Sequence, residues 1–272
     1  MKAVSTLWIK ILLWGYALFS MAPLLVMLIS SLRPTSEIFD KPLGLPSRPS
    51  LANYSKAWTE ASFSTYVVNS VVVVVAAVLL GAAVSLLAAY PLGRHVFRGR
   101  SLFTAYFIGG MTLPAHLGVL PLFYLLQSMG LVDSRLGLVL VYAAGSIPFN
   151  VFVLTAFFHQ LSDEMDEAAA LDGAGMFATF WHIMMPLVRP AIATVVVFQF
   201  VPMWNDFFYP LVLMRDENKL TLPVGLTHFF GEFQNDWGTL FAGLVMTTIP
   251  LVVLFVLATR QIVAGLTAGM NR

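Results

Sequence analysis

The sequence predicts an all-α polytopic membrane protein with six transmembrane helices, and two observations support this fold class. Only 11% of the 272 residues are charged and 58% are hydrophobic, whereas soluble domains carry roughly 25% charged residues. Six apolar stretches each have about the 20 residues that a helix needs to cross a bilayer core, and five of them contain no Asp, Glu, Lys or Arg. The six stretches are Ile11–Leu32, Tyr66–Leu92, Ser101–Leu126, Leu136–Phe158, Pro190–Met214 and Gly238–Thr259.

The first stretch, Ile11–Leu32, is longer than the ~7–15-residue apolar core of a cleaved signal peptide, so we interpret it as a membrane helix that is retained. The loop that follows, residues 33–65, contains four prolines. It indicates an irregular surface connection with a short helix near Leu51–Trp58.

Glycines and prolines in the third, fourth and fifth stretches leave two interpretations open. Such residues are tolerated in membrane helices when neighbours satisfy the backbone, and small residues let helices approach closely. One interpretation is ordinary packing of a helix bundle. The other is a set of bent helices around a pathway that opens and closes. The residues are Gly109, Gly110, Pro114, Pro121, Gly145, Pro148, Pro202 and Pro210.

Composition and missing motifs exclude several classes of protein. A net charge of +1 gives no nucleic-acid footprint, and the absence of cysteine excludes disulfides and thiolate metal sites. The histidines are scattered and form no HExxH zinc motif, and no GxxxxGK[ST] loop for binding ATP occurs. The segment GAGMFA (173–178) fits a dinucleotide fingerprint, but it follows an alanine run rather than a strand. We therefore expect no metal or cofactor in this chain.

The distribution of positive charge bears on the orientation. Six crossings place both termini on the same side, and the counts of Lys and Arg on the two sides are nearly equal. The short segment 91–100 has three Arg and no acid, which favours the cytoplasm under the positive-inside rule. This segment favours both termini in the cytoplasm, whereas the total counts leave the orientation open.

The segment DEMDEAAALDGAGMFATFWHIMMP (163–186) predicts a helix, a tight turn and a second helix outside the bilayer. Ser162 can cap the first helix, whose positive N-terminus suits Asp163, Glu164 and Asp166. Glycines then interrupt the helix, and Pro186 is expected to stop the second one. The glycines are Gly173 and Gly175, and the second helix has a stripe of Met176, Phe180 and Met184 beside Phe177 and Trp181.

Within this segment, Glu167-Ala168-Ala169 is followed by three residues and Gly173, and nine more residues lead to Ile183-Met-Met-Pro186. The spacing resembles the cytoplasmic EAA signature of the permease subunits of bacterial binding-protein-dependent ABC importers. Met185 stands where that family usually has Leu. The resemblance covers roughly residues 62–272. WNDFFYPLVL (204–213) and RQIVAGLTAGM (260–270) resemble its carbohydrate branch of maltose-type, MalG-like subunits.

The resemblance implies a type I ABC importer permease fold with a cytoplasmic EAA coupling helix. Residues 1–61 would form an N-terminal transmembrane helix and an extracytoplasmic loop. Residues 62–272 would form the importer transmembrane domain, with the EAA loop at 161–190. The chain would be a non-enzymatic, multi-pass subunit of the inner membrane, with both termini in the cytoplasm and with ATP and Mg on its partners. The implied partners are a second homologous permease, two ATP-binding-cassette ATPase subunits and an extracytoplasmic sugar-binding protein, besides the lipid bilayer.

The resemblance also implies roles for residues of the loop. In this family the coupling helix sits in a cleft of an ATPase subunit, where small residues allow close approach and apolar side chains supply contact. The expected coupling residues are Glu167, Ala168, Ala169, Asp172, Gly173, Ile183 and Pro186. The expected apolar face consists of Met176, Phe177, Phe180 and Trp181.

Polar groups inside the spans are candidates for a substrate pathway. Asp206 is the one charged residue in the six stretches, and a carboxylate at the bilayer centre costs about 2.5–3.5 kcal/mol on insertion scales. We therefore expect it to face the bundle interior. A sugar needs hydroxyl partners and aromatic faces, or these residues satisfy backbone freed by the prolines; both interpretations remain open. The candidates are Asn150, Gln199, Trp204, Asn205 and Asp206.

A different class of function, a self-contained secondary transporter or an intramembrane enzyme, predicts paired ionisable residues near the midplane. Only Asp206 is available, with His116 as the nearest thing to a partner. The sequence therefore favours the permease.

Overall fold

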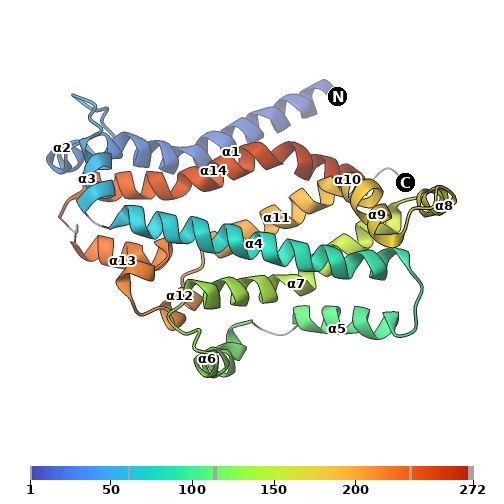
Figure 1. The fold of residues 1–272 in the computed structure, drawn as a ribbon. Helices are drawn as coiled ribbons and strands as arrows, with labels where there is room; N and C mark the ends of the chain where they lie inside the picture. The colour runs from blue at the N-terminus through green and yellow to red at the C-terminus, as the bar shows by residue number, and fades with distance from the viewer. Residues whose placement is uncertain (1, 61, 113–114, 233–234, 269–272) are drawn as a thin grey trace. The chain divides into compact units, whose positions relative to one another are not determined.

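The computed structural model describes residues 2–60, 62–112, 115–232 and 235–268, and every regular element within these ranges is helical (Figure 1). This confirms the all-α prediction. The helices before the polar loop are α1 (Lys2–Ser31), α2 (Thr35–Asp40), α3 (Ala52–Glu60), α4 (Phe63–Arg94), α5 (Arg100–Thr112), η1 (Ala115–Gly118), α6 (Val119–Ser128) and α7 (Arg135–Gln160). The later ones are α8 (Glu164–Leu171), α9 (Met176–Thr179), η2 (Phe180–Met184), α10 (Met185–Leu187), α11 (Arg189–Trp204), α12 (Phe208–Leu213), η3 (Glu217–Lys219), α13 (Leu222–Glu232) and α14 (Trp237–Ala268).

Four of the six predicted spans are single helices long and apolar enough to cross a membrane. They lie in α1, α4, α7 and α14. A fifth candidate is a bent pair, Met176–Leu187 and Arg189–Trp204, whose two parts meet at 73°. In the part of the chain that the structure describes, the helices therefore provide four or five candidate spans.

The prediction of one continuous helix is wrong for the other two stretches. Ser101–Leu126 contains the end of α5 at Thr112, a 3₁₀ turn and then α6, and Pro114 lies outside the described residues. Pro190–Met214 is divided because α11 ends at Trp204 and α12 begins at Phe208.

Side-chain hydrogen bonds explain the second break. Asp206 accepts hydrogen bonds from the backbone N–H groups of Phe208 and Tyr209, at 3.1 and 3.3 Å. These are donors that the first turn of a helix leaves unsatisfied. Pro210, which has no N–H, also lies in that first turn, where none is required. The break is therefore built by the residues that follow Trp204.

The chain divides into two compact units, of which the first comprises Met1–Val67 and Gly225–Pro250. Its connection between α1 and α3 is ordered by Arg33, which is buried and donates to the carbonyls of Glu37 and Lys41. An ion pair of 2.6 Å joins Lys56 to Asp236, which precedes α14. The predicted short helix near Leu51–Trp58 is confirmed as α3, and a second short helix, α2, was not predicted.

The second unit comprises Val68–Val224 and Leu251–Arg272. Its core joins α4, α7, η2 and α11 through side chains such as Tyr90, Leu154, Met184 and Val195. Close packing of α4 on α7 depends on Gly93, where a Cβ atom would collide with that of Phe158. This core holds the polar loop, α8 to α10, against the membrane helices.

At the start of α7, the end opposite the polar loop, a carboxylate holds two segments of this unit together. Asp133, just before α7, accepts from the backbone N–H groups of Arg215 and Asp216, at 2.9 and 3.1 Å, and pairs with Lys219 at 3.0 Å. The N–H group of Arg215, followed by that of Asp216, lowers the pKa of Asp133 to about 2. The start of α7 is thereby tied to the segment after α12.

Candidate functional site

The EAA segment forms the predicted helix, turn and helix. The turn after α8 is a Schellman motif, because the N–H of Ala174 reaches the carbonyl of Ala169 at 2.9 Å and that of Gly173 reaches Ala170 at 3.1 Å. Gly173 has φ +75°, a left-handed conformation that costs other L-residues about 1–2 kcal/mol. The spacing of the EAA signature therefore places glycine where the backbone requires it.

The prediction that the second helix ends at Pro186 is wrong. A π-helical turn, η2, runs through Phe180–Met184, and helix continues through Pro186 to Leu187. Because Met184 and Met185 before it have helical φ and ψ angles, Pro186 lies inside a continuing helix, where it removes one backbone hydrogen bond without ending the helix. The direction of the chain changes at Val188 instead, where φ is −91° and ψ is 7°.

A buried arginine at the end of α4 fixes this loop in place. Arg94 has a side chain only 2% exposed. Its Nε donates to Asp166 at 2.6 Å, its Nη1 to the carbonyl of Leu161 at 2.7 Å and its Nη2 to that of Ser162 at 2.9 Å. A longer bond of 3.2 Å reaches the carbonyl of Phe158 in α7. One guanidinium thus connects α4, the end of α7 and the first turn of α8.

The acids before the EAA motif therefore do more than cap a helix. The Ser162 hydroxyl does accept from the N–H of Glu164, at 3.3 Å, in agreement with the prediction. Asp166, however, pairs with Arg94, and Asp163 lies 3.2 Å from it although its side chain is 91% exposed. Breaking a buried ion pair by removal of one partner typically costs about 3–5 kcal/mol.

Most of the expected coupling residues lie on an exposed surface, which we call the loop surface. Its apolar members are strongly exposed: Met176 is 51% exposed, Phe177 70% and Trp181 58%. Sequence reasoning missed Leu171, which is 89% exposed. Polar and small members of the loop surface are Glu167, Ala168, Asp172 and Gly173, with Pro186 exposed and Ile183 half-buried nearby.

Two residues expected on that surface lie in the interior instead. Ala169 is 2% exposed and Phe180 is 3% exposed. The Phe180 ring packs against Tyr90 of α4, with centroids 5.1 Å apart. Ala169 was expected on the surface from the EAA signature and Phe180 from helical periodicity, and neither pattern shows which face of a helix packs inward.

A second feature is a cavity of about 470 Å³ between α7 and the break that separates α11 from α12. Two of the five predicted pathway residues, Gln199 and Asp206, line it. The Gln199 amide is buried and has no hydrogen-bond partner. Sequence reasoning missed the other polar and aromatic lining residues. Three of them, Tyr142, Ser146 and Phe149, recur at helical spacing on α7, and the other two are Phe198 of α11 and Tyr209 of α12.

The remaining pathway candidates do not line the cavity. Trp204 is buried and stacks on Phe200, with centroids 5.6 Å apart. Asn205 is exposed, and its side chain donates to the carbonyl of Val201 at 2.8 Å, which also accepts from the backbone N–H of Asn205 at the end of α11. Asn150 is fully buried, and its amide has no hydrogen-bond partner. Asp206 both caps α12 and accepts from the Tyr142 hydroxyl at 2.7 Å.

Replacing Arg94 with Gln should loosen the loop, because charge-assisted hydrogen bonds contribute about 1.5–3 kcal/mol each. We expect amide hydrogens of residues 164–171 to exchange about ten- to hundredfold faster, since ~1.4 kcal/mol corresponds to tenfold. Hydrogen–deuterium exchange mass spectrometry measures this. Arg98→Gln, an exposed arginine in the same connection, is the matched control. Unchanged exchange in Arg94→Gln would contradict the role of the arginine.

Comparisons with known proteins agree with this geometry. A family model described as the inner membrane component of binding-protein-dependent transport systems matches residues 81–267. The diacetylchitobiose uptake system permease protein NgcG of Streptomyces coelicolor is 37% identical, over 96% of this chain and 87% of the relative. The trehalose transport system permease protein SugB of Mycobacterium tuberculosis is 33% identical, over 97% of each chain.

The fold is also shared with a solved structure. A crystal structure of a bacterial ABC transporter involved in the import of the acidic polysaccharide alginate contains a chain that matches with a TM-score of 0.82. The two chains are 25% identical, and the match covers 95% of this chain and 96% of the other.

The family match decides against a self-contained secondary transporter or an intramembrane enzyme. Such a permease is not itself the ATPase and holds no cofactor. As part of a binding-protein-dependent system, it works with an ATPase and a binding protein. The chain therefore belongs to the family of inner membrane components of binding-protein-dependent transport systems, as the multi-pass permease of an ABC transporter.

Proposed function

We propose that this permease imports a carbohydrate, as one of two homologous permease subunits that work with two ATPase subunits and an extracytoplasmic sugar-binding protein. The names of its relatives support the substrate class, since they include uptake systems for diacetylchitobiose, trehalose and arabinooligosaccharides. ATP and Mg are held by the ATPase subunits.

The proposed topology has six crossings, two of them by broken helices. These are α1, α4, α5 with α6, α7, α11 with α12, and α14. Both termini and the EAA loop, residues 161–190, lie in the cytoplasm. The first crossing and its loop, residues 1–61, precede the importer transmembrane domain, residues 62–272. Non-helical backbone at membrane depth is tolerated where it is buried in protein or lines a cavity, which is compatible with the break at Asn205–Phe207 beside the cavity.

In this proposal α8 is the coupling helix, and the buried Arg94 is the observation that carries the assignment. An ATPase subunit that contacts the loop surface would move α8. Because Arg94 joins Asp166 of α8 to the ends of α4 and α7, the displacement reaches both membrane helices. Phe180 and Met184, buried in the core with Tyr90 and Val195, carry it to α11. Displaced helices would then open or close the cavity along α7.

Substitutions at Gly173 test the coupling. Val at this position cannot adopt φ +75° without strain, whereas Asn tolerates the left-handed region. No atom lies within 4 Å of a Cβ added there, so only conformation and the partner are affected. In the assembled transporter we expect Gly173→Val to lower uptake about tenfold while ATP hydrolysis continues. Gly173→Asn should retain most uptake.

The readout is sugar transported per ATP hydrolysed in proteoliposomes. Uptake at the wild-type rate by Gly173→Val would contradict the assignment of α8 as the coupling helix. Equal loss of uptake and of subunit assembly would also contradict it, because coupling would then not be the property affected.

The cavity along α7 is the proposed contact with sugar. Its volume lies within the ~300–1,000 Å³ typical of ligand sites. The Gln199 amide, the Ser146 hydroxyl and Asp206 can exchange hydrogen bonds with sugar hydroxyls, and the rings of Phe149 and Phe198 offer apolar faces. A buried amide without a partner is costly, at about 1–3 kcal/mol, and a passing hydroxyl would satisfy it.

Replacing Gln199 with Leu tests this role. The matched control is Asn150→Leu, the same change at a buried, unpartnered amide that does not line the cavity. We expect Gln199→Leu to lower kcat/KM for uptake about tenfold, while the control stays near wild type. Uptake of trehalose, diacetylchitobiose and arabinooligosaccharides first identifies the sugar. Equal effects of the two variants would contradict the proposal.

A further inference from the structure

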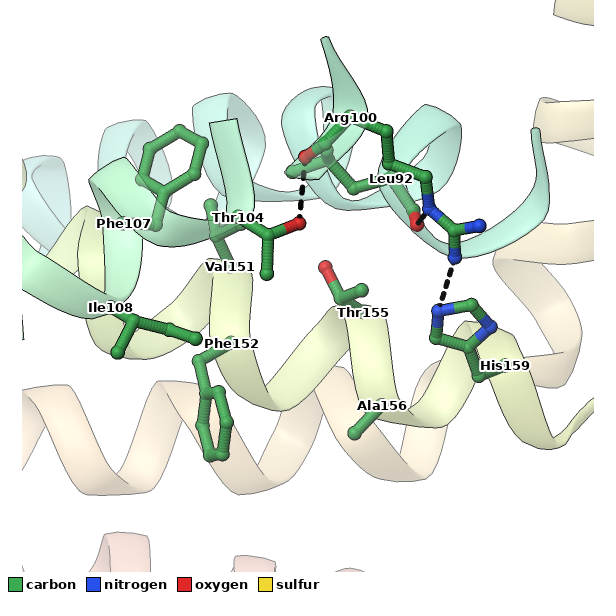
Figure 2. A pocket seen from close by; sticks show the side chains of 10 residues that line it. All are labelled: Leu92, Arg100, Thr104, Phe107, Ile108, Val151, Phe152, Thr155, Ala156 and His159. Atoms are coloured by element: carbon green, nitrogen blue, oxygen red, sulfur yellow. Dashed lines mark hydrogen bonds between the residues drawn. The ribbon is translucent and has the colours of Figure 1, made fainter. Parts of the chain in front are cut away.

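A second cavity, of about 360 Å³, lies between α5 and α7 in unit 2, at the end of these helices nearest the loop (Figure 2). Its lining changes character along both helices. Arg100 at the start of α5 and His159 near the end of α7 form the polar end. Further along the helices, the walls are apolar and aromatic, with Phe107, Ile108 and Phe152. At 1.5 Å per residue, the seven residues from Arg100 to Phe107 span about 10 Å.

The positive charge at the polar end has no acidic partner. Arg100 donates from Nε to the carbonyl of Leu92 at 2.9 Å, and its Nη2 lies 2.6 Å from Nε2 of His159. Arginine has no acceptor, so Nε2 of His159 accepts and the imidazole is neutral in this arrangement. None of the ion pairs found among the described residues includes Arg100.

A hydroxyl in the same cavity also has no partner. The Oγ1 atom of Thr155 is buried and makes no hydrogen bond. Figure 2 shows this oxygen directed into the space between Thr104 and the Arg100–His159 pair. An anionic oxygen placed there would accept from both the guanidinium and the hydroxyl.

We propose that this cavity binds an anionic glycerophospholipid, with its phosphate on Arg100 and an acyl chain along the apolar walls. The polar end lies at the ends of membrane-spanning helices, where headgroups are found, and basic pockets between such helices are suited to anionic headgroups. The apolar depth favours an amphipathic ligand over a free anion. This inference rests on the proposed topology, in which α5 and α7 belong to membrane crossings, but it does not depend on the sugar or on the coupling helix.

Lipid binding to the purified transporter tests the inference. Native mass spectrometry follows retention of dioleoylphosphatidylglycerol from mixed detergent micelles, with dioleoylphosphatidylcholine as the neutral lipid. We expect the wild type to prefer dioleoylphosphatidylglycerol. Arg100→Gln should lower the affinity of the transporter for this lipid about ten- to hundredfold. Arg98→Gln, an exposed arginine two residues away, should behave as wild type.

A second variant keeps the charge and blocks the acyl site. Ala156→Phe adds a ring to the cavity lining without touching the hydrogen bonds of Arg100, and it should lower retention of the anionic lipid while melting in neutral detergent is unchanged. The inference is overturned if the wild type shows no preference between the lipids or if Arg100→Gln and Ala156→Phe keep the preference. The inference is also overturned if inorganic phosphate stabilises the transporter against melting as much as the anionic lipid does, because the site would then be one for a free anion.

Discussion

The buried guanidinium of Arg94 is the interaction on which the rest of the account depends. A charge withdrawn from water requires compensation, and here it is supplied by Asp166 and by carbonyl groups at the end of α7. The polar loop is thus not a flexible excursion from the membrane but a part of the helix bundle. Because its inner face is used in this way, its outer face, with Leu171 and Phe177, remains free to contact a partner.

The same economy of polar groups shapes the cavity along α7. The Asp206 carboxylate accepts a hydrogen bond from a backbone N–H group in the first turn of α12 and another from the Tyr142 hydroxyl. One side chain therefore caps a helix and lines the cavity. The two interpretations left open by the sequence, backbone repair and a pathway, are compatible for this residue. They separate for its neighbours: the side chain of Asn205 donates to helix backbone, and Gln199 lines the cavity without a partner.

Local patterns in the sequence predicted local structure well. Apolar length predicted four of the spans, and the EAA spacing predicted the turn at Gly173. Breaks in the other two spans were not located, because proline alone does not decide between a kink and an end. Pro186 was expected to end a helix that in fact turns at Val188. Contacts between distant residues were out of reach: Arg94 and Asp166 are 72 positions apart, and nothing local to either residue reveals the other.

The connection made by Arg94 is tested most directly by the distance between the loop and the end of α4 while the ATPase works. The chain has no cysteine, so spin labels can be placed at Leu171→Cys and Val96→Cys, which are 89% and 92% exposed in the wild type. If Arg94 makes α8 and the end of α4 one body, the mean distance between the labels should differ by less than about 2 Å between nucleotide-free and ATP-bound transporter. The distribution of distances between the labels should broaden in Arg94→Gln. A change in the wild type of about 5 Å, one helical turn, would show that the loop moves independently and would contradict the account.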